Sequence, residues 1–308
     1  MLNYLVHRFI WLLVVMAGVL VITFTLTSFI PGDVAIFYAG PHASAQVIAE
    51  TRHELGLDQP KIVQFFDYVK RVAQGDFGHS ATLDEPVSQA ISDRVGATAL
   101  LAVTVIAIEM ALAVFFGVWA SMKDRGLMDR SVALMASLGV SLPGFWLGIM
   151  LLYLVAFKLG ILPLGGYGDP KWQYLILPAC TQGVPNGFWY ARILKVSLRT
   201  VLHEDYIRTA RSKGLWRLRV VLKHGLPNAI LPVITIAAMD LGQLLGGIVV
   251  VETVFSWPGI GQQAYQALLN LDVPLVIGTV LFTGLCIALL NIVADLLRVI
   301  IDPRIRLA

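Results

Sequence analysis

Long runs of apolar residues, separated by shorter polar segments, dominate the chain. Six of these runs approach or exceed the roughly 20 residues that a helix needs to cross a bilayer. They lie at about Phe9–Phe29, Ala97–Ala120, Val132–Phe157, Tyr174–Leu194, Asn228–Val251 and Pro274–Leu297. The chain is 57% hydrophobic and only 14% charged, which is more apolar than a soluble domain needs. The pattern predicts an all-α integral membrane protein with six transmembrane helices.

The distribution of basic residues predicts the orientation of these helices. Most of the 23 Lys and Arg residues fall in segments that lie inside if the N-terminus lies inside, and cytoplasmic segments are enriched in such residues. Both termini are therefore expected in the cytoplasm. Residues 1–30 are interpreted as an uncleaved first transmembrane helix, because the apolar run is too long for a signal peptide. The fourth run is expected to be kinked, because Pro178, Gly183 and Pro185 interrupt it.

The largest segment expected outside the cytoplasm spans residues 31–96. Apolar residues recur in it at helical spacing, which predicts an amphipathic helix that begins at Pro60 and ends at Gly75. These residues are Ile62, Phe65, Phe66, Val69 and Val72. The segment is either a lid on the outer membrane surface or a docking surface for a partner protein. Residues 97–308 are expected to form a five-helix core.

A few polar residues interrupt the apolar runs. Glu109 and Asp240 lie in mid-span, where a charge costs at least roughly 2.5–3.5 kcal/mol. They are therefore either protonated and hydrogen-bonded between helices or facing a water-filled path. Asn186 and Glu252 are further candidates for lining a path. Trp257, Pro258 and Gly259 follow the fifth run, and form either a re-entrant turn at the outer mouth of a path or a simple loop anchored by the tryptophan.

The strongly charged segment Glu204–Pro227 is expected on the cytoplasmic side, within a loop of residues 197–227. Glu204 and Asp205 favour a helix N-terminus. Ile207, Ala210, Arg211 and Gly214 share one face of that helix, and this face is smooth except for the arginine. Such a helix suits insertion into a groove of another protein, or it lies on anionic lipid.

The sequence offers no catalytic or metal-binding pattern. It contains no G-x-x-x-x-G-K-[ST], H-E-x-x-H, C-x-x-C or G-x-S-x-G motif. Its six histidines are scattered, and its two cysteines form no disulfide framework. No basic stripe interleaved with aromatic residues suggests nucleic-acid binding. We therefore expect a protein that is not an enzyme and that binds no cofactor or metal itself.

Several motifs together resemble one family. The stretch D-Y-I-R-T-A-R-S-K-G-L at Asp205–Leu215 is similar to the cytoplasmic "EAA" loop of ABC importer permeases, in the form of the dipeptide/oligopeptide type. Ala210, Gly214, Leu226 and Pro227 match the general pattern E-A-A-x3-G-x9-I-x-L-P, whereas Arg208, Thr209 and His224 depart from it. Further matching stretches are Ile30–Asp33, Leu55–Pro60, Gly75–Ser80, Val251–Gly259 and Asp302–Arg306, so the resemblance covers essentially the whole chain.

The resemblance implies a type I importer permease in a bacterial cell membrane. Such a permease pairs with a second, similar permease and with two ATP-binding subunits, which hold the ATP and magnesium, and a solute-binding protein delivers cargo from outside. The loop would couple the permease to the ATPases. The residues expected to do so are Asp205, Ile207, Arg208, Ala210, Arg211, Gly214, Leu226 and Pro227.

The cargo implied by the resemblance is a di- or oligopeptide. Permeases of this type are similar across peptide, nickel and glutathione systems, so the same machine with another small solute stays open. An ion-coupled secondary transporter that uses Glu109 and Asp240 as proton carriers is a second class of function. It predicts transport by the chain alone, although the six runs contain no evident inverted repeat.

Overall fold

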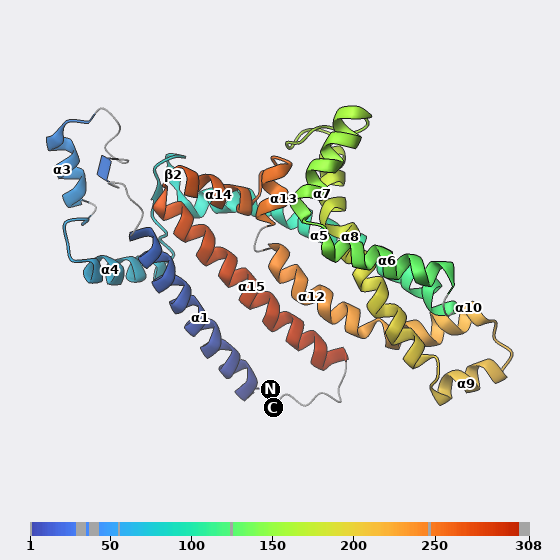
Figure 1. Cartoon of the computed structure of the whole chain (residues 1–308). Coiled ribbons are helices and arrows are strands. Elements are labelled where there is room, and N and C mark those ends of the chain that lie inside the picture. The colour runs from blue at the N-terminus through green and yellow to red at the C-terminus, as the bar shows by residue number, and fades with distance from the viewer. Residues whose placement is uncertain are drawn as a thin grey trace.

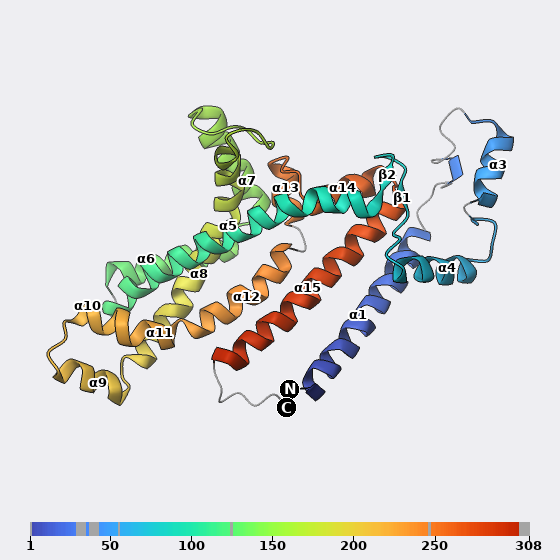
Figure 2. The same ribbon diagram turned by 180° about the vertical axis from the view of Figure 1, so that it is seen from behind.

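The computed structural model of the chain is almost entirely helical (Figures 1 and 2). It describes residues 2–28, 35–36, 43–54, 56–123, 126–245 and 248–301. Within these ranges the only strands are β1 (His79–Ser80) and β2 (Glu85–Pro86), which pair antiparallel with His79 opposite Pro86. The predicted all-α fold class is confirmed.

Five long helices form the frame of the molecule. They are α1 (Leu2–Ser28), α5 (Val87–Met122), α8 (Lys171–Val201), α12 (Leu231–Leu245) and α15 (Val273–Ile301). Both views show α12, α15 and α1 side by side in that order (Figures 1 and 2). The start of α1, the end of α15 and the charged segment after α8 lie at the same end of the molecule (Figure 1), as the predicted orientation requires.

The described helices differ in how well they suit a bilayer. By length and composition, α5 and α15 can each cross a membrane, and up to four spans result when each of two bent helix pairs counts as one. In α1 the apolar part is the shorter stretch Ile10–Thr25. In α8, Gln182, Asn186 and Arg192 interrupt the apolar residues. The number of six spans therefore stays a prediction from the sequence pattern.

The third predicted span, Val132–Phe157, is not one straight helix. It consists of α6 (Leu127–Ser141), followed by α7 (Gly144–Leu151) and the π-helix η1 (Leu152–Lys158), and the two parts meet at 104°. Pro143 has no N–H to donate, and a residue before proline is driven out of the helical region. Leu142 accordingly has φ −86° and ψ 128°. The prediction of a single helix was wrong here.

The fifth predicted span, Asn228–Val251, is also divided. Three short helices precede α12, and the last of them overlaps the start of the predicted span: α10 (Arg217–Val220), η2 (Val221–Gly225) and α11 (Leu226–Ala229). The direction changes by 49° between residues 217–229 and α12. A separate helix, α13 (Val249–Val254), follows α12. The fourth predicted span lies within α8, which continues through Pro178 and Pro185; the predicted kink there stays a prediction.

Glycines allow α8 to approach its neighbours closely. A Cβ on Gly139 of α6 would lie 3.0 Å from the Cα of Pro185, and a Cβ on Gly117 of α5 would lie 3.0 Å from the carbonyl oxygen of Ala191. At Gly187 a Cβ would lie 2.7 Å from Cδ1 of Leu112. The backbone of α8 therefore lies close to the backbones of both α5 and α6 in the core of the molecule.

We expect Gly187→Ala to destabilise the chain by about 1–3 kcal/mol, because the new methyl group overpacks the contact with Leu112. Unfolding of the purified chain in mixed micelles measures this loss of free energy. Gly18→Ala is the matched control, because a Cβ on Gly18 meets nothing within 4 Å; its stability should stay the same or rise slightly. Equal stability of the two variants would contradict the expectation.

The segment expected outside the cytoplasm contains α3 (Ala45–Glu54) and α4 (Lys61–Ala73). Helix α4 begins after Pro60, and the chain turns at Gly75 with φ +82°, which agrees with the predicted amphipathic helix. Tyr68 is buried against the outer halves of α1 and α15. In the last turn of α3, a hydrogen bond from His53 to Asp58, together with the charge of the Asp58 carboxylate, raises the pKa of His53. The expected boundary at residues 96 and 97 falls inside α5, which begins at Val87.

A buried carboxylate fixes the hairpin that follows α4. Asp272, which precedes α15, accepts hydrogen bonds from the Ser80 hydroxyl at 2.6 Å and the Thr82 amide at 3.1 Å. It also accepts the amide of Leu275 at 3.2 Å, so it caps the first turn of α15. The hairpin and the start of α5 are thereby held against α15.

Candidate functional site

The charged segment after α8 folds into a short helix, α9 (Asp205–Ser212). Asp205 lies in its first turn, where a negative charge is favourable. Gly214 follows the helix with φ +77°, a conformation that glycine adopts without strain. The chain then returns through α10, η2 and α11 to the membrane core (Figure 1). Leu226 packs into the core of α5 and α8, and exposed Pro227 occupies the first turn of α11.

The apolar face of α9 packs on the chain itself. Ile207 is fully buried and Ala210 is 7% exposed, and both contact Val220 in a cluster that includes Leu202 and Leu215. The prediction that Ile207 and Ala210 form the contact face for a partner was therefore wrong. These side chains face the chain itself. The apolar side of a short helix is buried against an apolar surface nearby, which here belongs to the same chain.

The exposed residues of α9 and of the turn that follows it are mostly basic. They are Arg208, Arg211 and Lys213, together with Asp205 and Gly214. The ion pair of Arg208 with Asp205, at 3.5 Å, is fully in solvent and contributes little to stability. Trp216, which is 69% exposed, and the exposed Arg217 and Arg219 extend this surface. We call these exposed residues of 205–219 the basic surface of the coupling segment; whether they contact a partner stays a prediction.

Ion pairs tie the end of α8 to α6, and a hydrogen bond ties it to α5, next to the coupling segment. Asp129 of α6 forms ion pairs with Lys195 and Arg199. Its Oδ1 lies 2.6 Å from Lys195 Nζ, and its Oδ2 lies 3.1 Å from Arg199 Nη2. Arg199 also donates to the carbonyl oxygen of Ala120 at 3.2 Å, and Arg217 donates to the carbonyl oxygen of Met122. This clamp was missed in the sequence, although Lys195 and Arg199 lie one helical turn apart and signal a shared partner.

A cluster of polar side chains lies among α5, α8 and α12. Fully buried Glu109 accepts a hydrogen bond from Asn186 at 3.1 Å. One turn further along α8, the Tyr190 hydroxyl donates to Asp240 Oδ2 at 2.5 Å. Glu109 and Asp240 are close enough to interact electrostatically. The sequence-based interpretation missed Tyr190, whose spacing of four residues from Asn186 places both on one face of α8.

The structure divides the four residues proposed to line a path. Asn186 and Asp240 are partly exposed, whereas Glu109 and Glu252 are fully buried. Glu252 Oε1 accepts the Thr98 hydroxyl at 2.8 Å, and its Oε2 accepts the amide of Gln262 at 2.9 Å. Thr98 in turn accepts the amide of Ile260 at 2.9 Å. In this conformation Glu252 therefore holds the segment between α13 and α14 (Ile260–Leu269) against α5.

Trp257 belongs to the same junction. It is fully buried, and its indole N–H donates to the carbonyl oxygen of Ala97 at 2.9 Å. The tryptophan therefore anchors this turn inside the chain, against the start of the second predicted span. Gly259 is required here because a Cβ would collide with the carboxylate of Glu252. The turn at Trp257, Pro258 and Gly259 is locked to the start of the second predicted span.

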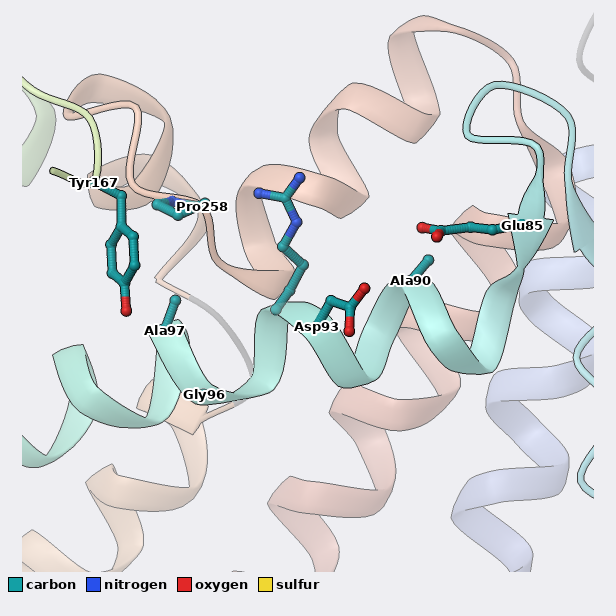
Figure 3. Close-up of a pocket in the computed structure, with 8 residues that line it drawn as sticks. Glu85, Ala90, Asp93, Gly96, Ala97, Tyr167 and Pro258 are labelled. Carbon is teal, nitrogen blue, oxygen red and sulfur yellow. The ribbon is translucent and has the colours of Figure 1, made fainter.

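A shallow pocket of about 410 Å³ lies beside this turn. Figure 3 shows Tyr167 and Pro258 near Ala97 at one end of the pocket, and Glu85 near Ala90 at the other. Asp93, Arg94 and Gly96 complete the lining. Among the residues that the structure describes, no group of three or more His, Cys, Asp or Glu side chains is placed to hold a metal ion.

The fold and these sites define a multi-pass membrane protein with a buried polar cluster and an exposed cytoplasmic helix. The family described as "binding-protein-dependent transport system inner membrane component" matches residues 113–307, and the N-terminal part of such membrane components matches residues 1–102. The chain belongs to this family. It is thus a permease subunit of an ABC importer, an inner-membrane protein, as the motifs predicted.

Individual relatives cover the whole chain. The glutathione transport system permease protein GsiC of Salmonella typhimurium (strain LT2) is 41% identical over 306 residues, which is 99% of each chain. GsiC of Escherichia coli (strain K12) is 40% identical over the same length and coverage. Among solved structures, the MetNI methionine ABC transporter in inward-facing conformations is similar with a TM-score of 0.55. At 17% identity, over 70% of this chain and 97% of the other, this likeness shows the type I importer fold alone.

Proposed function

We propose that this chain is the transmembrane subunit of an importer for small peptides, with glutathione, a tripeptide, as the first cargo to test. The proposed cargo rests on the 41% identity to a glutathione permease over 99% of both chains. It supports the glutathione alternative over the general di- and oligopeptide cargo that the motifs suggested. Nickel is less favoured, because none of the six histidines lies in a predicted span.

We further propose the partners that the family resemblance implied: a second permease, two ATP-binding subunits and an extracytoplasmic solute-binding protein. The chain itself catalyses no reaction and binds no cofactor; ATP and magnesium belong to the ATP-binding subunits. The exposed basic surface of the coupling segment supports this arrangement, because it presents several exposed cations that an acidic groove could bind. ATP-driven closure would shift the permease between inward- and outward-open states by binding one state better than the other.

Uptake by the complete importer in proteoliposomes tests the proposal. Labelled glutathione, dialanine and Ni²⁺ are offered in separate experiments, each with the solute-binding protein outside and ATP inside. We expect uptake of glutathione that stops when either ATP or the binding protein is left out. Uptake of Ni²⁺ without glutathione would contradict the cargo. Uptake by this chain alone, driven by a proton gradient, would instead support the ion-coupled alternative.

A further inference from the structure

Asp240 keeps one carboxylate oxygen available at a partly exposed position within the predicted membrane region. Its Oδ2 accepts the Tyr190 hydroxyl at 2.5 Å. Within the described parts of the chain, no other hydrogen bond and no Lys or Arg reaches this carboxylate. An unpaired anion at such a depth is costly and marks a functional position by default.

Asp240 lies at the edge between the buried and the exposed side of α12, because Ala237 and Leu244, about one turn away on either side, are buried. Gln243, three residues further along, is exposed, and Met239 is 38% exposed. Residues at this spacing share one side of a helix. A carboxylate and an amide on one side of a membrane helix are unfavourable against lipid. This side of α12 therefore faces water or another protein surface in the assembled importer.

A second observation comes from Glu109. Its side chain is fully buried, and its Oε2 has no hydrogen-bond partner in the structure. Asn186 occupies only its other oxygen. Glu109 and Asp240 are close enough to interact. Burial disfavours the charged form of Glu109, so the negative potential of this region comes from Asp240. A positively charged group that reaches Asp240 is therefore favoured, and Glu109 lies too deep to touch it.

We propose that Asp240 binds the protonated α-amino group of the cargo as it crosses the membrane. This inference rests on the proposed function, since peptides and glutathione all carry such a group. Asp240 Oδ1 accepts the ammonium protons, and Tyr190 is a positioning residue that holds Oδ2. A hydrogen bond to a charged group is stronger than one between neutral groups. The site thus selects cargo with a free amino group over neutral or anionic solutes.

The competing interpretation is that Asp240 only links α12 to α8 through Tyr190. Two substitutions separate these roles. Asp240→Asn removes the charge, but the amide oxygen still accepts the Tyr190 hydroxyl. Tyr190→Phe removes the link and keeps the charge. Ammonium binding predicts that the first variant is far more damaging, whereas a structural link predicts the reverse order.

The complete importer is reconstituted with wild-type chain, Asp240→Asn, Asp240→Glu or Tyr190→Phe, and glutathione uptake per ATP hydrolysed is measured. We expect Asp240→Asn to lower this ratio about tenfold or more, the factor that loss of a charged hydrogen bond produces. Asp240→Glu and Tyr190→Phe should stay within about threefold of wild type. ATP hydrolysis stimulated by the loaded binding protein should continue in all variants. Asp240→Ser is a second neutral variant if Asp240→Asn does not assemble.

Near-wild-type uptake by the neutral variants overturns the inference while the proposed cargo stands. An equal loss in Tyr190→Phe and Asp240→Asn also overturns it, because the pair then has a structural role. Failure of the wild-type importer to take up either glutathione or dialanine overturns the proposed cargo and this inference together.

Discussion

Replacing Arg208 and Arg211 together by glutamate should abolish ATP-driven uptake, with a loss of at least about tenfold. Both side chains are exposed on α9 and lie about one turn apart. If they enter an acidic groove of the ATP-binding subunits, the double change places like charges against each other, which costs several kcal/mol. Copurification of the ATP-binding subunits and uptake in proteoliposomes measure the effect.

The matched control for this double variant is Lys61→Glu with Lys70→Glu. These two lysines are exposed on α4, so the change in net charge is the same but lies far from the coupling segment. The control should copurify with the ATP-binding subunits as wild type does. Unchanged uptake by the variant with both Arg208 and Arg211 replaced, at normal expression, would contradict a coupling role for the basic surface.

Replacing Glu252 by alanine should destabilise the chain by about 2–4 kcal/mol. The substitution leaves the Thr98 hydroxyl and the Gln262 amide without their acceptor in a buried site, and each unpaired donor costs roughly 1–3 kcal/mol. It also leaves a cavity beside Gly259. The free energy of unfolding in mixed micelles, measured on the purified chain, reports the loss.

Two further variants control this measurement. Glu252→Gln keeps one carbonyl oxygen at the site and should lose less than half as much stability. Glu50→Ala removes an exposed glutamate of α3 and should leave stability unchanged. A Glu252→Ala chain as stable as wild type would show that the junction between α5 and α14 does not depend on this carboxylate.

The hydrophobic pattern was sufficient for the fold class but not for the path of each helix. Apolar runs and the periodic residues of α4 predicted helices where the structure has them. The bend at Pro143 was missed because the run from Val132 to Phe157 was judged by its length. Its physical cause was present in the sequence, since a residue before proline, here Leu142, leaves the helical region.

The candidate sites could be predicted only in part, because side-chain direction depends on tertiary contacts. The motif located the coupling segment, but the partner for Ile207 and Ala210 proved to be Leu202, Leu215 and Val220 of the same chain. Tyr190 resembles an ordinary packing residue until Asp240 is brought beside it.

The apolar contacts that hold α9 to the rest of the chain decide which helices would move with it. Because Ile207 and Ala210 are embedded in apolar contacts with Leu202 and Val220, α9 cannot swing freely on a loose loop. Leu202 directly follows α8, and the ion pairs of Asp129 with Lys195 and Arg199 join the end of α8 to α6. If the ATP-binding subunits displace α9, as the proposed coupling requires, these contacts would move α8 and α6 together with it.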